Sequence, residues 1–153
     1  MLLRLFVIVA LFVIPLCFTG CRSEDPEEIW ELDRNKILEY IAIHSLTAIE
    51  HTSGIFYVVD VEGSGPHPTL NSRVNVKYTG MLLDGTIFDA SGGTTFTVGN
   101  TIQGWQIGIP LFRAGGKGKL LIPSALGYGA NPPGGIPRNA PLVFDIEIIE
   151  LRN

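Results

Sequence analysis

Residue types that support metal, phosphate or covalent chemistry are present in this sequence, but their spacing does not fit any of them. The three histidines, His44, His51 and His67, have no metal-like spacing, and the part predicted to fold has no cysteine. The segment AGGKGK lacks the first glycine of a phosphate-binding loop and the Ser or Thr after its lysine. No serine stands in a nucleophile elbow. We therefore expect no metal, no cofactor and no covalent intermediate.

The remaining candidates for chemistry are aromatic side chains and one acid. Six aromatic residues lie at strand ends, in a short predicted helix or in loops: Tyr78, Phe88, Phe96, Trp105, Tyr128 and Phe144. For any single one of them, a place in the hydrophobic core is the simpler interpretation. Trp105 and Tyr128 stand out because each adjoins glycine, which permits close approach of another molecule. Asp89 is a lone acid in an otherwise apolar run.

The elements that must position these residues are mainly strands. Strands are predicted at 54–63 and 72–82, and in the segments TTFTVG, GGKGKLLIP and LVFDIEIIEL. Asp84-Gly85 predicts a two-residue hairpin turn. Residues 101–112 contain the one short helix of this half. We therefore expect residues 51–153 to form an α+β domain, with a mostly antiparallel sheet packed on one short helix.

Residues 126–145 hold four prolines and four glycines. Such a composition is typical of a linker or a disordered tail. The stretch runs directly into an apolar strand, however. Two interpretations are therefore open at this point, a loose connector and a shaped wall beside a site.

A separate helix is predicted at 26–44. Asp25 can cap it, Pro26 suits its first position and Glu28 completes a capping box. One face carries a set of large side chains: Trp30, Ile37, Tyr40, Ile41 and His44. We expect this helix to pack on its own domain or to space the domain from a membrane. Self-association through residues 26–44 is the alternative.

Residues 1–20 have the pattern of a secretory signal, with Arg4, a long apolar run and small residues at the end. The segment FTGC, which ends at Cys21, resembles the bacterial lipobox, whose cysteine is lipidated and becomes the new N-terminus. This resemblance implies a lipid-anchored protein of the bacterial cell envelope, and we expect it at the outer membrane, on the periplasmic face or the cell surface. An ordinary cleaved signal and an uncleaved anchor are the alternatives.

The charge balance argues against a nucleic-acid partner. The chain has a formal net charge of −4, with 11 basic and 15 acidic residues. Removing residues 1–20 removes Arg4 alone, which leaves 10 basic against 15 acidic residues and a net charge of −5. No basic patch is apparent, so neither nucleic acid nor adhesion to acidic lipid is expected.

Four motifs resemble those of the FKBP-type peptidyl-prolyl cis-trans isomerases: VKYTGMLLDGTIFDAS, TIQGW, GGKGKLLIPSALGYG and GGIPRNAPLVFDIEII. They occur in the family's order within residues 54–151, and the chain looks like a bacterial lipoprotein member. The resemblance implies a twisted antiparallel sheet wrapped around one short helix, and the separate helix predicted at 26–44 precedes it. Together with the predicted signal and helix, it divides the chain into a lipoprotein signal peptide (1–20), a tether with the helix (21–50) and an isomerase domain (51–153).

The resemblance also implies a set of site residues. The catalytic residues would be Tyr78, Asp89 and Tyr128. An apolar cavity with Trp105 as its floor would bind the substrate through Phe88, Phe96, Thr101, Ile102, Trp105, Ile136 and Phe144. Ile136 would lie at the rim, on a flap formed by residues 132–137.

Three departures from the family pattern concern this site. The segment between Asp89 and Phe96 is shorter than in many members, and the arginine that often pairs with the pocket acid is absent. Because an unpaired buried carboxylate is costly, Asp89 needs another partner, such as the hydroxyl of Tyr78 or Tyr128. Thr101 stands where the family usually has an apolar valine.

The implied activity is acceleration of X–Pro bond rotation in exported proteins by noncovalent binding of the twisted amide. Proline-containing polypeptides would be the partners, and the family's macrolide inhibitors are further candidate ligands. The main alternative is a proline-binding or holdase chaperone module with weak catalysis. A structural lipoprotein with a vestigial pocket is a third interpretation.

Overall fold

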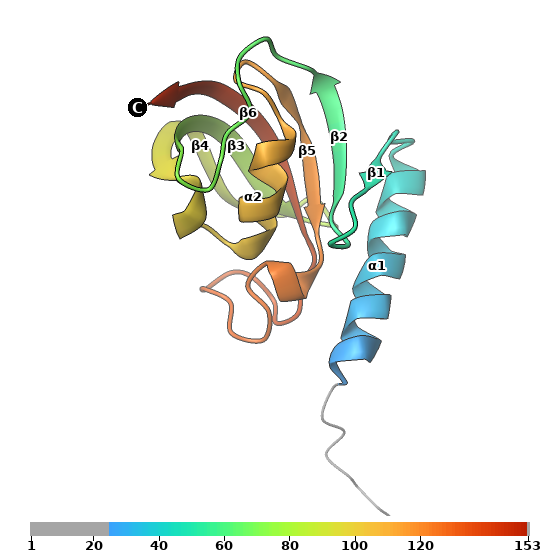
Figure 1. Cartoon of the computed structure of the whole chain (residues 1–153). Coiled ribbons are helices and arrows are strands. Elements are labelled where there is room, and N and C mark those ends of the chain that lie inside the picture. The colour runs from blue at the N-terminus through green and yellow to red at the C-terminus, as the bar shows by residue number, and fades with distance from the viewer. Residues whose placement is uncertain (1–24, 153) are drawn as a thin grey trace, which may run out of the picture.

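A computed structural model describes residues 25–152, so the predicted signal peptide and Cys21 lie outside the described residues. One antiparallel sheet has the strand order β1-β2-β5-β6-β3-β4 (Figure 1). Its strands are β1 Ile49–Glu50, β2 Phe56–Val61, β3 Arg73–Leu82, β4 Ile87–Thr97, β5 Lys117–Ile122 and β6 Leu142–Arg152. The helices are α1 Pro26–Ile43 and α2 Gln103–Gly108, with 3-10 turns η1 Val98–Asn100, η2 Ile109–Leu111 and η3 Ser124–Leu126. This is the α+β architecture expected from the sequence.

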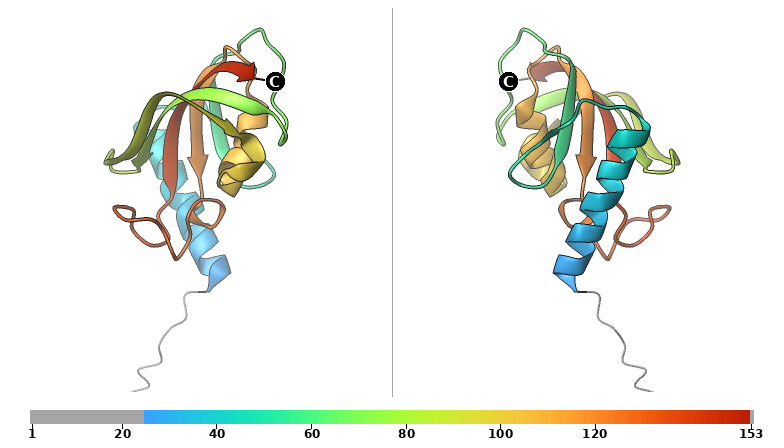
Figure 2. Two further views of the ribbon diagram at one scale, coloured as in Figure 1. Left: turned by 90° about the vertical axis from the view of Figure 1, so that its left-hand side faces the viewer. Right: turned by 90° about the vertical axis from the view of Figure 1, so that its right-hand side faces the viewer.

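The helix α2 packs closely on one face of the sheet (Figure 2). Glycine makes this approach possible at two positions one turn apart. A Cβ atom at Gly104 would lie 2.4 Å from Ile122 Cγ2, and one at Gly108 would lie 2.6 Å from the side chain of Leu120. Both contacts are shorter than real Cβ contacts, so α2 is held against β5 at a separation that only glycine allows. This fixes the position of Trp105, which follows Gly104.

The helix α1 covers part of the opposite face of the sheet (Figure 1). Ile37 is fully buried and packs with Phe56 of β2, Leu121 of β5 and Val143 of β6. The next residues along these strands point to the other face, because side chains alternate along a strand. Arg34 also donates two hydrogen bonds to Glu50, of 2.9 and 2.8 Å. The helix therefore packs on its own domain.

Two local predictions were wrong. Residues 83–86 connect β3 to β4, in place of a two-residue turn, and the Leu82 N–H donates to Thr86 O at 2.9 Å to close this loop.

The segment TTFTVG is not a separate strand, because its first four residues belong to β4, which runs without a break from Ile87 to Thr97. Two register shifts place extra residues in β4 opposite β3, and Phe88 lies at the second of them. Bulges bend a strand locally and redirect side chains.

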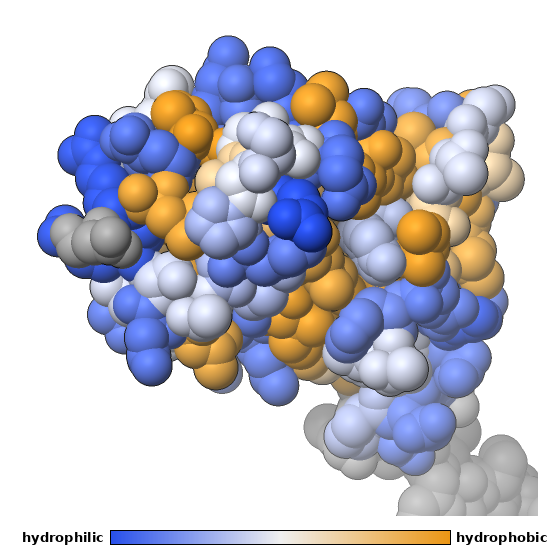
Figure 3. Space-filling view, turned by 45° about the horizontal axis from the view of Figure 1, so that its top comes forward, coloured by the Kyte–Doolittle hydropathy of each residue, from blue (hydrophilic) through white to orange (hydrophobic). Residues whose placement is uncertain are grey.

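Exposed apolar side chains are interspersed with hydrophilic ones on the face viewed in Figure 3. Within residues 25–152, no helix has the length and apolar character needed to cross a membrane. In the same residues, no three His, Cys, Asp or Glu side chains gather as metal ligands would.

Candidate active site

A cavity of about 460 Å³ lies between the sheet, α2 and the loop after β5. Its lining comes from β3, β4, η1, the start of α2, the loop after η3 and β6: Tyr78, Asp89, Thr94, Phe96, Asn100, Thr101, Ile102, Trp105, Tyr128 and Phe144. Eight of the ten residues predicted for the site are in this lining. Phe88 and Ile136 are not, and Thr94 and Asn100 were not predicted.

Trp105 lies at the centre of an aromatic cluster. Its side chain is 6% exposed, and its ring centroid is 5.1 Å from those of Tyr78, Phe96 and Phe144. The planes of Tyr78 and Phe144 are at 89° and 79° to that of Trp105, which is the edge-to-face arrangement that aromatic pairs prefer. The rings thus support one another and form an apolar wall.

Phe88 and Ile136 support this wall from outside the cavity lining. Phe88 packs edge-on against Phe144 with ring centroids 5.6 Å apart. Gly80 leaves room for this contact, since a Cβ atom there would lie 2.8 Å from both rings. Ile136 is 9% exposed and belongs to the main core, although the sequence analysis placed it at the rim. A loop that folds inward buries the one large apolar side chain between its prolines and glycines.

Asp89 has the partner that the sequence analysis expected. The Tyr78 hydroxyl donates a hydrogen bond to Asp89 Oδ2 over 2.7 Å. The assumption that Asp89 is buried was wrong, because its side chain is exposed at the edge strand β4. Its charge is therefore hydrated on one side and hydrogen-bonded on the other.

The two pocket tyrosines hold their protons more tightly than free tyrosine. Burial, followed by the hydrogen bond and charge of Asp89, raises the pKa of Tyr78 to about 12. Burial and the charge of Asp89 also raise the pKa of Tyr128. Both hydroxyls are thus neutral hydrogen-bond donors at neutral pH.

Tyr128 is held by hydrogen bonds on both sides. The carbonyl oxygen of Ser124 accepts the N–H groups of Gly127 and Gly129, at 3.0 and 2.9 Å. Gly129 has φ +56°, in the left-handed region, and its carbonyl oxygen accepts the Asn139 N–H at 2.9 Å. The stretch rich in proline and glycine is therefore a shaped wall of the cavity at Tyr128, and the loose-connector interpretation is wrong.

The start of α2 presents a free donor. The Thr101 hydroxyl donates to Val98 O at 2.7 Å, so the polar atom that replaces an apolar side chain here is satisfied locally. Ile102 lines the cavity, and among the described residues no acceptor is found for its backbone N–H. Likewise, no hydrogen-bond partner is found within residues 25–152 for the Tyr128 hydroxyl. The Ile102 N–H and the Tyr128 hydroxyl are thus available to a ligand at the margin of the cavity, and the buried Trp105 Nε1–H at its floor also has no partner among the described residues.

Thr94 and Asn100 were missed because their sequence context carries no signal. Thr94 pairs with Val76 next to a register shift in β4, and such shifts cannot be read from one sequence. Asn100 lies in η1, a 3-10 turn of three residues that no periodicity marks. Both are polar residues at the margin of an otherwise aromatic cavity.

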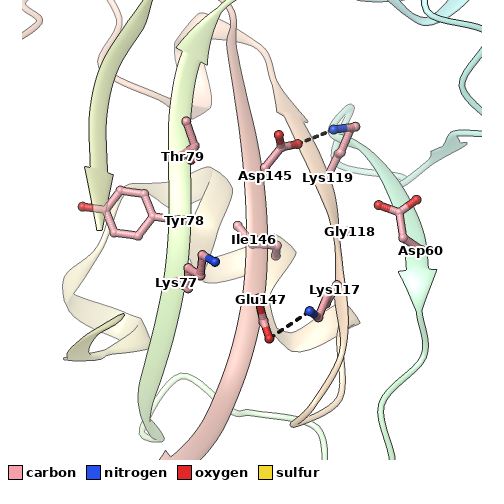
Figure 4. A pocket seen from close by; sticks show the side chains of 10 residues that line it. All are labelled: Asp60, Lys77, Tyr78, Thr79, Lys117, Gly118, Lys119, Asp145, Ile146 and Glu147. Atoms are coloured by element: carbon pink, nitrogen blue, oxygen red, sulfur yellow. Dashed lines mark hydrogen bonds and ion pairs between the residues drawn. The ribbon is translucent and has the colours of Figure 1, made fainter. Parts of the chain in front are cut away.

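A second, smaller groove of about 280 Å³ lies on the sheet face turned away from α2 (Figure 4). Its walls are charged, and two ion pairs cross from β5 to β6, whereas Asp60 and Lys77 have no ion pair among the described residues. Lys117 Nζ lies 3.1 Å from Glu147 Oε1, and Lys119 contacts Asp145 (Figure 4). A partly exposed ladder of paired charges is a common way to solvate an outer sheet face. The aromatic cavity is the better candidate for a functional site.

A sheet wrapped around a short helix, with an aromatic cavity between them, is an arrangement shared with known proteins. The family model for FKBP-type peptidyl-prolyl cis-trans isomerases matches residues 65–149, which is more than half of the chain. The chain therefore belongs to this family.

Individual relatives agree with this assignment. The FKBP-type peptidyl-prolyl cis-trans isomerase FkpA of Buchnera aphidicola subsp. Schizaphis graminum is 41% identical over 107 residues, which are 67% of this chain and 42% of that protein. A crystal structure of a peptidyl-prolyl cis-trans isomerase from Pseudomonas syringae pv. tomato has a TM-score of 0.74 at 34% identity. That match covers 84% of this chain and 97% of the other. FkpA from Escherichia coli has a TM-score of 0.72 at 30% identity, over 82% and 62% of the two chains.

The chain spans less than half the length of the first curated relatives that it matches. It covers 42% of the Buchnera protein and 38% of FkpA from Aeromonas hydrophila. The similarity therefore concerns the domain that contains the cavity.

Proposed function

We propose that the protein is a peptidyl-prolyl cis-trans isomerase that accelerates rotation about X–Pro bonds in exported proteins. The observation that carries this proposal is the aromatic cavity around Trp105, with two unpaired hydrogen-bond donors at its margin. Membership of the isomerase family supports it. No residue in the cavity is arranged for covalent attack, and the reaction requires none.

The chemistry follows from the electronic structure of the amide. Resonance holds the peptide bond planar, with a rotation barrier of roughly 18–20 kcal/mol. For X–Pro bonds the two planar forms are close in energy, but they interconvert over tens to hundreds of seconds. An enzyme need only bind the twisted amide more tightly than either planar form. Twisting reduces charge separation in the amide, so an apolar cavity from which water is excluded favours the twisted state.

The wall residues would exclude water while the marginal donors hold the chain. Trp105 and Phe144 contact the proline ring in this account, and the Tyr128 hydroxyl and the Ile102 N–H bind substrate carbonyl oxygens. The Tyr78 hydroxyl is already engaged by Asp89 and positions that wall of the cavity. Because the pKa values of both tyrosines are raised, the hydroxyls donate hydrogen bonds and do not act as bases near neutral pH.

The test is the cis-to-trans isomerisation of a short Xaa-Pro peptide by residues 22–153. We expect catalysis well above the uncatalysed rate, a strong loss in Trp105→Leu, and no change in Lys117→Gln, which alters only the outer groove. Binding without catalysis would contradict the proposal and would support the proline-binding or holdase alternative. Macrolides of the type that inhibit this family would serve as competing ligands in the same assay.

We also propose that the protein is anchored by lipid at Cys21, which lies outside the described residues. The support is the lipobox-like FTGC segment after an apolar run. Several acyl chains together hold a protein at a membrane nearly permanently, whereas one holds it weakly. Metabolic labelling with a fatty acid should mark the protein, and Cys21→Ser should abolish the label. A label that persists in the variant would exclude this anchor.

Self-association through residues 26–44 stays a prediction. In the structure Ile37 packs on the domain, while Leu32 and Ile43 are 52% and 70% exposed and are available to a second copy. Sedimentation analysis of the wild-type protein and a Leu32→Ser, Ile43→Ser variant decides the point. A dimer that the double substitution disrupts would support self-association, and a monomer at high concentration would contradict it.

A further inference from the structure

Asp33 is a buried acid that the proposed mechanism does not use. It lies on α1, on the face that packs against the domain, and its side chain is only 1% exposed. Asp33 Oδ2 accepts the backbone N–H of Ser124 at 2.8 Å. Among the described residues, Asp33 Oδ1 has no hydrogen-bond partner, and neither has the buried Ser124 hydroxyl. Burying a carboxylate with so few partners is unfavourable, so its presence on α1 calls for a role.

Ser124 connects Asp33 to the loop that carries Tyr128. Ser124 begins η3, directly after β5. Its N–H donates to Asp33, while its carbonyl oxygen accepts the N–H groups of Gly127 and Gly129, which flank Tyr128. The backbone of Ser124 is thus hydrogen-bonded to α1 through its N–H, and its carbonyl oxygen fixes the loop that carries Tyr128.

The loop around Tyr128 leaves little freedom for another arrangement. A Cβ atom at Gly127 would lie 2.9 Å from Leu142 Cδ1 of β6, so the chain passes close to the sheet there. Gly129 has φ +56°, which residues other than glycine rarely adopt. The hydroxyl of Tyr128 can therefore reach the cavity only while the turn at Ser124 keeps its place.

We propose that Asp33 is a positioning residue for Tyr128, and that α1 is by this contact a part of the catalytic unit. The inference rests on the proposed function of Tyr128 as the hydroxyl that binds a substrate carbonyl. Asp33 Oδ2 is the acceptor found among the described residues for the Ser124 N–H, so removing it frees the first residue of η3.

Two kinds of variant separate positioning from simple attachment of α1. Asp33→Ala removes the acceptor of the Ser124 N–H, whereas Asp33→Asn keeps an acceptor oxygen of the same reach. Ile37→Ala is the matched control, since it weakens the packing of α1 one turn further along and leaves the acceptor of the Ser124 N–H in place. Asp33→Ser, whose shorter side chain cannot reach Ser124, replaces Asp33→Ala if that protein does not fold.

The first readout does not depend on catalysis. Amide hydrogen exchange at Gly127 and Gly129, measured by NMR on the purified protein, should be faster in Asp33→Ala than in the wild type. Exchange at these amides should stay near the wild-type rate in Asp33→Asn and Ile37→Ala. Equal rates in all four proteins would overturn the proposal, even if the protein proved to have no isomerase activity.

The second readout is kcat/KM for an Xaa-Pro peptide. Because small displacements of a binding group can cost up to about 100-fold, we expect Asp33→Ala to lower kcat/KM by about 3- to 10-fold. Asp33→Asn should restore most of this loss, and Asp33→Ala should add little in a Tyr128→Phe background, since coupled residues are not additive. A loss of the same size in both backgrounds would show that Asp33 acts independently of Tyr128. An inactive wild-type protein would instead refute the proposed function and leave the exchange result to decide the positioning.

Discussion

The Tyr78 hydroxyl donates a 2.7 Å hydrogen bond to Asp89 Oδ2, which links the inner strand β3 to the edge strand β4 at the margin of the aromatic cavity. The contact has a consequence for the second pocket tyrosine. With Tyr78 engaged, the Tyr128 hydroxyl is the pocket hydroxyl that can meet a substrate carbonyl, beside the unpaired Nε1–H of Trp105 at the cavity floor. The two tyrosines have the same side chain, but they should therefore differ in their contribution to activity.

Removing the two hydroxyls separately should reveal this difference. A typical hydrogen bond contributes about 0.5–1.5 kcal/mol, so Tyr128→Phe should lower kcat/KM for an Xaa-Pro peptide by about 2- to 10-fold. Tyr78→Phe should have a smaller effect, because its hydroxyl faces Asp89. Steady-state assays of the two variants under one set of conditions make the comparison. A larger loss in Tyr78→Phe would contradict the assigned roles.

The raised pKa of Tyr78 predicts a loss of stability at high pH. The pKa of Tyr78 is raised to about 12 in the folded protein, above the ordinary value of about 10, so folding favours the protonated form. This contribution to stability is fully present below pH 10 and is lost as the pH rises toward 12. Absorbance at 295 nm should show both pocket tyrosines of the wild type ionising at higher pH than free tyrosine, with Tyr78 ionising near pH 12.

The same titration has a control in Asp89→Asn. The hydrogen bond and charge of Asp89 are causes of the high pKa of Tyr78, second only to burial. The substitution should move the ionisation of Tyr78 to lower pH without removing it, whereas Tyr78→Phe should remove that ionisation and leave the one of Tyr128. An unchanged titration in Asp89→Asn would show that burial alone sets the pKa.

The close packing of α2 predicts a sharp contrast between two glycines. Gly104→Ala would bring a Cβ atom to 2.4 Å from Ile122 Cγ2, so α2 must shift and carry Trp105 with it. Overpacking of this kind costs about 1–3 kcal/mol. Gly134→Ala is the control, because nothing lies within 4 Å of a Cβ atom there. Urea denaturation should show a lower free energy of unfolding for Gly104→Ala and little change for Gly134→Ala.

The two tryptophans allow ligand binding to be followed in the cavity itself. Trp105 is the cavity floor, whereas Trp30 packs over Gly54 on the α1 side of the molecule. Titration with a proline peptide should change the emission of Trp105. The change should persist in Trp30→Phe and disappear in Trp105→Phe. A signal carried by Trp30 would place the ligand elsewhere.

Much of the fold was predictable because the strands and α1 carry strong local signals. Alternating apolar residues in β3 and β6 marked buried faces, and Asp25 and Pro26 marked the start of α1, where Asp25 Oδ1 accepts the Glu27 N–H. The two-residue strand β1 was not predicted, since two residues show no periodicity. The continuity of β4 was missed because Gly92 and Gly93, at the first register shift, are typical of a loop between two strands.

The site was predictable in its aromatic part through the family motifs, and less so in its polar part. Phe88 was expected in the lining, but it lies at a bulge that turns it toward Phe144. The burial of Asp33 could not be predicted from the sequence, because an acid on an amphipathic helix is normally solvent-exposed. Its burial depends on contact with η3, 91 residues further along the chain, and only tertiary structure reveals it.

The central claim, that the aromatic cavity catalyses X–Pro rotation, is tested most directly by exchange NMR on a peptide with resolved cis and trans signals. With residues 22–153 present in catalytic amount, we predict exchange cross-peaks between the two isomers that are absent without protein. The cross-peaks should weaken strongly with Trp105→Leu and persist with Lys117→Gln. Shifted peptide signals without cross-peaks would mean that the cavity binds proline and does not catalyse its isomerisation, which would contradict the account.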